Sequence, residues 1–237
     1  MKDRGVLYGV GVGPGDPELL TLRAARVLGR VEEVFAASSS KNDYSLALSI
    51  AEKHVRPGAA IRNLAFPMTR DPEGLARAWE ANAKAVLDAL HTGRDAAFLT
   101  LGDPMLFSTF VYLLRAVRAL EPEVRVEVVP GVTSFQQAAA VSGTPLAESG
   151  ESLLVLSGVN ETRDLARRMQ GADNAVILKA YRNFPAIRDW LASEDLDREA
   201  VFASRLGLEG ETVVRGLADL PDDPHYLSLL LIKKGRA

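Results

Sequence analysis

The stretch Gly9–Thr21, GVGVGPGDPELLT, closes the first apolar run of the chain and is rich in glycine. A dinucleotide-binding turn needs glycine at the first, third and sixth positions of its window. Counted from Gly9 the sixth position is Pro14, and counted from Gly11 it is Asp16. No Gly-Lys-Ser/Thr sequence follows, so the pattern of a phosphate loop is absent as well. The stretch predicts a strand that turns into a helix, and it argues against NAD as the ligand.

The residues after the turn predict how the helix begins. Asp16 suits the N-cap, Pro17 the first helical position and Glu18 the first turn. A carboxylate then occupies the place where a pyrophosphate would bind. Two interpretations stay open at this point: a loop that bounds some other ligand, or a tight turn that binds nothing.

Composition narrows the class of protein. The chain has 237 residues, 47% of them hydrophobic, which is enough for one or two domains with substantial cores. Charged residues make up 25% and the formal net charge is −3, so no basic excess indicates nucleic acid. We expect a small-molecule partner and no nucleic acid.

Cysteine and histidine usage limits the possible chemistry. The absence of cysteine excludes disulfides, thiolate metal sites and a cysteine nucleophile, and it fits a reducing compartment. His54, His91 and His225 are far apart in sequence and form no HExxH pair, so we expect no protein-bound metal. The N-terminus lacks a signal-peptide apolar core, and the chain has no long uninterrupted apolar run. We expect a cytoplasmic protein with no membrane partner.

Strand and helix patterns alternate through the first half, which predicts a mainly parallel sheet covered by helices. The expected strands cover residues 7–12, 34–37, 59–64, 96–101 and 124–129, and the expected helices cover residues 17–29, 45–54, 73–91, 105–120 and 133–141.

The pattern changes at SGTPLAESG, Ser142–Gly150, a stretch of small and turn-forming residues. We therefore predict an N-terminal α/β domain over residues 1–145 and a C-terminal α/β domain over residues 146–237. The expected strands of the second domain are 152–156, 175–181, 200–205, 211–215 and 226–233, with helices at 162–169 and 185–192. The short segment LGLEG between two of these strands indicates a hairpin, so the second sheet is predicted to be mixed.

Three strand-to-helix junctions of the first half share one design, namely Gly13–Asp16, Gly102–Pro104 and Pro130–Ser134. Ligands of parallel sheets bind outside the carboxyl ends of the strands, so these turns should line one crevice. Asp103, Thr133 and Ser134 are also suited to capping helices. Capping and ligand contact are compatible, and both interpretations remain open for these residues.

Several segments together carry a resemblance to a known family. GVGVGPGDPELLTLRAARVL, FLTLGDPMLFSTFVYLL and VVPGVTSFQQAAA resemble the characteristic segments of the tetrapyrrole methylases, S-adenosylmethionine enzymes that modify corrinoid precursors. Within that family, FPMTRDPEGLARAWEANAKAVLDAL and TLGDPMLFST are most similar to the precorrin-2 C20-methyltransferases, also called cobalt-factor-2 C20-methyltransferases. The resemblance spans nearly the whole chain.

The resemblance implies two α/β domains, a homodimer, and S-adenosyl-L-methionine held in the cleft between the domains. It also implies a set of cofactor-binding positions, which are Pro14, Gly102, Asp103, Leu106, Thr133, Ser134, Tyr181, Leu206 and Ser228.

The implied reaction is methyl transfer to the C20 meso carbon of precorrin-2 or cobalt-factor-2 in cobalamin biosynthesis. The methyl group of the cofactor sits on a positively charged sulfur, so no protein nucleophile or metal is required, and no catalytic base is identified. A tetrapyrrole substrate carries many carboxylates, for which Lys41, Arg182 and Arg205 are the candidate donors. The alternative for each of the three is a solvated surface charge, which is the more common role of such residues.

Other functions remain open on the sequence alone. The target could be another corrin position, uroporphyrinogen, or the modified histidine of an elongation factor. A different class is a non-catalytic nucleotide-binding module that binds a ligand without turnover. The sequence also leaves open whether the substrate is metal-free or contains cobalt.

Overall fold

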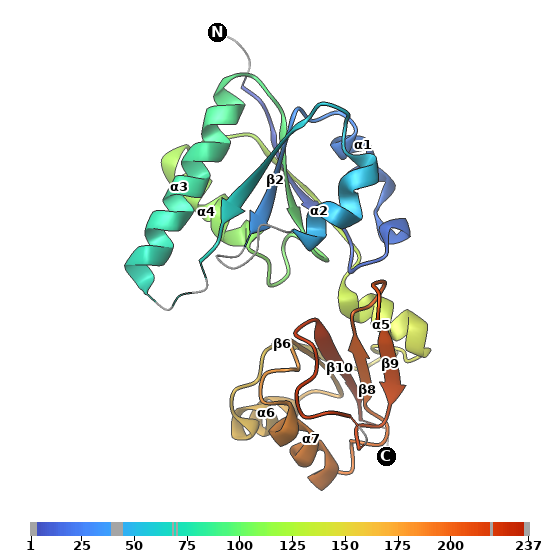
Figure 1. Cartoon of the computed structure of the whole chain (residues 1–237). Helices are drawn as coiled ribbons and strands as arrows, with labels where there is room; N and C mark the ends of the chain where they lie inside the picture. Colours follow the sequence, from blue (N-terminus) through green and yellow to red (C-terminus); the bar gives the residue numbers. More distant parts are fainter. Residues whose placement is uncertain (1–3, 39–44, 68, 70, 219, 235–237) are drawn as a thin grey trace. The chain divides into compact units, whose positions relative to one another are not determined.

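The computed structural model describes residues 4–38, 45–67, 69, 71–218 and 220–234. The chain forms two compact units, Met1–Thr133 and Ser134–Ala237 (Figure 1). Within the described residues, every helix is too short or too polar to cross a membrane.

The first unit contains a five-stranded parallel sheet with the strand order β3-β2-β4-β1-β5. Its strands are β1 (Leu7–Gly11), β2 (Glu33–Ser38), β3 (Ala60–Ala65), β4 (Ala96–Thr100) and β5 (Val126–Val129). The central strands β1 and β4 are buried along their whole length, as expected for strands covered on both faces.

Helices cover both faces of this sheet, as Figure 1 shows. They are α1 (Leu22–Leu28), α2 (Leu46–Ala51), α3 (Pro72–His91) and α4 (Phe110–Leu120), with a short 3-10 turn, η2 (Glu52–His54), after α2. Alternate residues of β1 serve the two cores: Tyr8 and Val10 pack with α1 and α2, whereas Leu7 packs with α3 and α4.

The connections of the first unit place a topological switch point between β1 and β4. The chain leaves β1 toward β2 and β3 through helices on one face, and it leaves β4 toward β5 through α4 on the other face. Adjacent parallel strands whose connections run in opposite directions open a crevice at their carboxyl ends. The loops that follow β1 and β4 therefore lie where a ligand is expected.

The first helix is interrupted, whereas the sequence predicted one helix over residues 17–29. A 3-10 turn, η1 (Pro17–Leu19), comes first, and Asp16 caps it by accepting the Glu18 N–H at 2.8 Å. Thr21 then caps α1, because its hydroxyl oxygen accepts the Ala24 N–H at 3.2 Å. Asp16 is thus a cap of the turn only.

Helix α4 begins at Phe110, whereas the prediction placed its start at residue 105. The hydroxyls of Thr100 and Ser108 form a buried hydrogen bond of 2.8 Å, and the Ser108 oxygen accepts the Phe110 N–H at 3.1 Å. Phe107 has the left-handed backbone angle φ 49°, which cannot continue a right-handed helix. Residues 101–109 are therefore an ordered loop.

The second unit contains a five-stranded sheet that is mixed, as predicted, and its strand order is β6-β7-β10-β8-β9. Its strands are β6 (Leu153–Ser157), β7 (Asn174–Leu178), β8 (Val201–Ser204), β9 (Thr212–Arg215) and β10 (Ser228–Lys233). Strands β6 and β7 are parallel, β10 is antiparallel to β7 and β8, and β8 and β9 form the expected hairpin.

Three helices cover the second sheet, namely α5 (Ser134–Ser142), α6 (Thr162–Met169) and α7 (Phe184–Ser193). Helices α6 and α7 pack on one face, and α5 packs on the other through Phe135 and Ala138. The structure thus assigns α5 to the second unit, whereas the predicted boundary between residues 145 and 146 left it in the first. The apolar residues of α5 pack against Val201 and Leu229, which accounts for the difference.

We expect the Ser108→Ala substitution to lower the free energy of unfolding by about 1–3 kcal/mol, because it leaves the Phe110 N–H and the Thr100 hydroxyl without their buried partner. Chemical denaturation measures the change. The control is Ser193→Ala, which removes an exposed hydroxyl that donates to the Trp190 carbonyl at 2.7 Å and should change stability by less than about 0.5 kcal/mol. Equal effects of the two substitutions would contradict a structural role for the buried hydroxyl pair.

Candidate functional site

The loops after β1, β4 and β5 meet at the carboxyl edge of the first sheet. Gly102, in the loop after β4, donates its N–H to the Gly13 carbonyl at 2.8 Å, which joins it to the loop after β1. Asp103 joins the same loop to the one after β5, because its Oδ2 accepts the Gly131 N–H at 3.1 Å. The three predicted strand-to-helix junctions therefore lie next to one another in the structure.

Glycine is required where these loops approach one another most closely. A Cβ atom built on Gly131 would lie 2.1 Å from the Gly102 carbonyl oxygen, and one built on Gly11 would lie 2.5 Å from the same oxygen. Real Cβ contacts are never this short, so a side chain at either position would force the loops apart. The Gly102 carbonyl is therefore enclosed between two glycines.

Asp103 is not a helix cap, because α4 begins seven residues later at Phe110. Its Oδ1 accepts the Met105 N–H at 2.8 Å, so both carboxylate oxygens bind main-chain N–H groups. The capping interpretation of this residue is thus replaced by a bridge between two loops. Thr133 and Ser134 lie at the start of α5, as the capping interpretation requires. Thr133 directly precedes the helix, and Ser134 is its first residue.

The structure brings together the residues predicted for this edge. Pro14, Gly102, Asp103, Leu106 and Thr133 all lie in the joined loops, and each is partly exposed. The sequence prediction missed two further side chains of the loop after β4, Met105 and Phe107, because it placed both in a helix. Their exposed fractions are 54% and 53%, so two large apolar side chains face solvent beside the predicted cofactor positions.

The second unit has a comparable edge. Because β10 runs antiparallel to β7 and β8, its first residue lies beside the last residues of those strands. The Tyr181 N–H donates to the Ser228 hydroxyl at 3.0 Å, and the Arg205 N–H donates to the Leu227 carbonyl at 3.0 Å. The predicted positions Tyr181, Ser228 and Arg205 therefore lie along one edge of the second sheet.

Leu206 also belongs to this edge, but its side chain is 4% exposed and packs in the core with Val201 and Leu229. Ser228 is buried too, and its hydroxyl already accepts the Tyr181 N–H. Leu206 can offer a ligand only its main chain.

Positive charge gathers at the same edge. Lys179 follows β7 and Arg205 follows β8, and both have left-handed backbone angles, φ 56° and 55°. Such a conformation costs about 1–2 kcal/mol for a residue with a side chain, and strained residues cluster at functional sites. Lys179 was missed by the sequence prediction, since backbone strain leaves no mark on an ordinary lysine in the sequence.

Arg205 has hydrogen-bonding capacity that the described part of the chain does not use. Its Nε atom is buried and has no hydrogen-bond partner among the described residues. Within the same residues, neither Arg205 nor Arg182 forms an ion pair, and Arg182 donates from Nε to the Tyr181 hydroxyl at 3.2 Å. Lys41, the third predicted donor, lies outside the described residues.

His225 precedes β10 and lies near Arg205. Partial burial, and secondly the positive charge of Arg205, lower the pKa of His225, which keeps the imidazole neutral at neutral pH. Its Nδ1 accepts the Leu227 N–H at 3.1 Å, so the proton of the neutral ring is on Nε2. This edge therefore carries a neutral donor beside its cations.

The chain matches the family model of the Tetrapyrrole (Corrin/Porphyrin) Methylases over residues 6–221. It belongs to this family. The predicted family and the predicted two-unit α/β fold are thereby confirmed.

Among the relatives of this tetrapyrrole methylase, the cobalt-precorrin-2 C(20)-methyltransferase of Salmonella typhimurium is 37% identical over 232 residues, which are 97% of each chain. The precorrin-2 C(20)-methyltransferase of a Sinorhizobium species is 34% identical, over 96% of this chain and 95% of its own. A crystal structure of the uroporphyrin-III C-methyltransferase of Thermus thermophilus, complexed with S-adenosylhomocysteine, has a TM-score of 0.63 and 26% identity, over 97% of this chain and 98% of its own.

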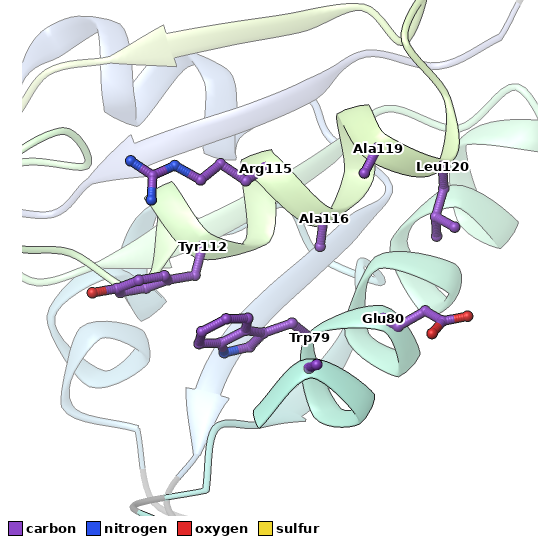
Figure 2. A pocket seen from close by; sticks show the side chains of 8 residues that line it. Trp79, Glu80, Tyr112, Arg115, Ala116, Ala119 and Leu120 are labelled. Atoms are coloured by element: carbon purple, nitrogen blue, oxygen red, sulfur yellow. The ribbon is translucent and has the colours of Figure 1, made fainter. Parts of the chain in front are cut away.

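The methylase also has an apolar groove on its surface, between α3 and α4 (Figure 2). Trp79 of α3 stacks on Tyr112 of α4 with ring centroids 5.0 Å apart, and the groove continues along α4 to Leu120. None of the predicted cofactor or substrate residues lines it. Elsewhere, no group of three or more His, Asp and Glu side chains in the described part of the chain could hold a metal ion.

We expect Gly131→Ala to lower the melting temperature, because the new Cβ would lie 2.1 Å from the Gly102 carbonyl oxygen and would push the loops after β4 and β5 apart. Forced overpacking of this kind costs about 1–3 kcal/mol. The matched control is Gly171→Ala, where an added Cβ meets nothing within 4 Å. If calorimetry gave the same melting temperature for both variants, the close approach of the loops would not constrain the fold.

Proposed function

We propose that this methylase transfers the methyl group of S-adenosyl-L-methionine to the C20 meso carbon of precorrin-2 or cobalt-factor-2 in cobalamin biosynthesis. The observation that carries the proposal is the end-to-end similarity to C(20)-methyltransferases, at 37% and 34% identity over nearly the whole of each chain. The names of these two relatives cover both the cobalt-containing and the metal-free substrate.

The joined loops of the first unit are suited to hold the cofactor. A Cβ built on Gly102 would have no atom closer than 3.9 Å, so there is room for a ligand atom against its main chain. Hydroxyl groups follow at Thr133 and Ser134, and apolar surface is present at Leu106. The residues that we propose to form the S-adenosylmethionine site are Pro14, Gly102, Asp103, Leu106 and Thr133 of the joined loops, Ser134 at the start of α5, and Tyr181, Leu206 and Ser228 of the second unit.

When bound, S-adenosylmethionine supplies a methyl group activated by a positively charged sulfur. The chain therefore needs no nucleophile of its own, and the attacking atom is the C20 carbon of the tetrapyrrole. What the residues contribute is placement, since holding two reactants in near-attack geometry supplies on the order of 7–11 kcal/mol. The hydrogen bond from Gly102 to Gly13 and the close glycine contacts restrain the three loops relative to one another, which supports such placement.

The cations at the edge of the second unit are suited to the carboxylates of the tetrapyrrole. Arg205 has an unused buried Nε donor, and the guanidinium group of Arg182 is exposed. Charge-assisted hydrogen bonds from arginine to carboxylate are strong and directional. We propose that Arg182 and Arg205 bind substrate, together with Lys41. A homodimer in the cytoplasm also stays a prediction of the family resemblance.

The direct test is incubation of the protein with methyl-¹³C-labelled S-adenosylmethionine and precorrin-2, in metal-free and cobalt-loaded forms. We expect the label at C20 of one or both products, detected by NMR. Label at another ring position would contradict the C20 assignment and leave a different tetrapyrrole target. Cofactor binding without turnover on any tetrapyrrole would favour a non-catalytic nucleotide-binding module.

Removing a substrate-binding cation should affect the binding of the tetrapyrrole and not that of the cofactor. We expect Arg205→Ala to raise the KM for the tetrapyrrole about tenfold or more, since a hydrogen bond to a charged group is worth about 1.5–3 kcal/mol, and to leave the affinity for the cofactor unchanged. Steady-state kinetics with each substrate varied in turn measures both. Arg167→Ala, which removes an exposed arginine of α6 paired with Asp164, is the control and should alter neither constant. An unchanged KM in the Arg205 variant would remove that residue from the substrate site.

A further inference from the structure

Asp103 joins two loops at the carboxyl edge of the first sheet, whereas the loop carboxylate of Asp95 joins distant segments before β1 and β4, because its Oδ1 accepts the Val6 N–H at 2.8 Å. Asp16 accepts an N–H from Glu18 in its own turn, and Asp71 accepts N–H groups from Glu73 and Gly74 at the start of α3. Asp103 accepts one N–H from its own loop, at Met105, and a second from Gly131. The second bond reaches a segment that is 28 residues away in sequence.

The segment that Asp103 holds contains a predicted cofactor position. Gly131 lies two residues before Thr133, in the connection from β5 to α5. Glycine has the greatest backbone freedom of any residue, so an unrestrained Gly131 would allow the peptides that follow it many orientations. A hydrogen bond from its N–H to a partly buried carboxylate removes much of that freedom.

We propose that Asp103 is a positioning residue of the methyl-transfer site: its carboxylate holds the loop from Gly131 to Thr133 so that Thr133 meets S-adenosylmethionine. The proposal rests on the proposed function, from which it takes the cofactor. In this arrangement the effect of Asp103 on cofactor affinity passes through the Gly131 N–H and the loop.

A double-mutant cycle separates positioning from an independent contact. The affinity for S-adenosylhomocysteine is measured by titration calorimetry in the wild type, Asp103→Ala, Thr133→Ala and the double variant. Because releasing the loop also displaces Thr133, we expect each single substitution to weaken binding about tenfold and the double variant to be no weaker than the worse single one. Losses that multiply, to about a hundredfold in the double variant, would overturn the proposal, as would wild-type affinity in either single variant.

The control for loss of stability is Asp71→Ala, which also deprives two main-chain N–H groups of a carboxylate, but within one segment. It should lower the melting temperature and keep the affinity for S-adenosylhomocysteine within about twofold of the wild type. If this control weakened binding as much as Asp103→Ala, the effect of Asp103 would be one of general stability, and the proposal would be wrong.

If Asp103→Ala does not fold, Asp103→Asn takes its place in the cycle. Asparagine keeps one acceptor oxygen and turns an NH₂ group toward the other N–H donor, so the cycle should show the same non-additivity with a smaller loss. Failure of the positioning role can be distinguished from failure of the proposed function. Wild-type binding of S-adenosylhomocysteine with an additive cycle contradicts the positioning role alone, whereas methyl label at a position other than C20 contradicts the regiochemistry alone.

Discussion

The close approach of the Gly102 carbonyl to Gly11 and Gly131 is the constraint on which the rest of the site depends. The three peptide segments are packed so closely that a Cβ atom on Gly11 or Gly131 would collide with the Gly102 carbonyl oxygen. This contact sets the spacing of the loops after β1, β4 and β5, and the hydrogen bonds to Gly13 and from Gly131 set their orientation. Residues without side chains thus place the residues whose side chains are available to a ligand.

The two units organise their edges by different means. In the first unit all strands are parallel, so connections of opposite direction meet at the switch point between β1 and β4. In the second unit the antiparallel strand β10 brings its start between the ends of β7 and β8, and left-handed backbone turns carry Lys179 and Arg205 there. The first edge presents main chain, hydroxyl and apolar groups, whereas the second presents positive charge.

Most strands could be predicted from the sequence because each is an apolar run bounded by turn residues, and the carboxyl-end rule then indicated the edge where the loops after β1, β4 and β5 meet. The start of α4 could not be predicted, because it depends on a tertiary contact between the hydroxyls of Thr100 and Ser108. The apolar residues Met105 and Leu106 also have a spacing that is compatible with a helix. The bridge made by Asp103 and the enclosure of the Gly102 carbonyl are likewise contacts between segments distant in sequence. Local pattern and the family resemblance indicated candidate residues, whereas the contacts that join them became known only from the fold.

The enclosed carbonyl also limits how such a site can diversify. A loop taken from a relative would bring its own path past Gly102, and any side chain in place of Gly11 or Gly131 would collide with that oxygen. A chimera that keeps this junction must therefore exchange the three loops together, including Asp103 in the loop after β4. Single substitutions that leave this junction intact are possible at exposed side chains of the same loop, such as Met105 and Phe107.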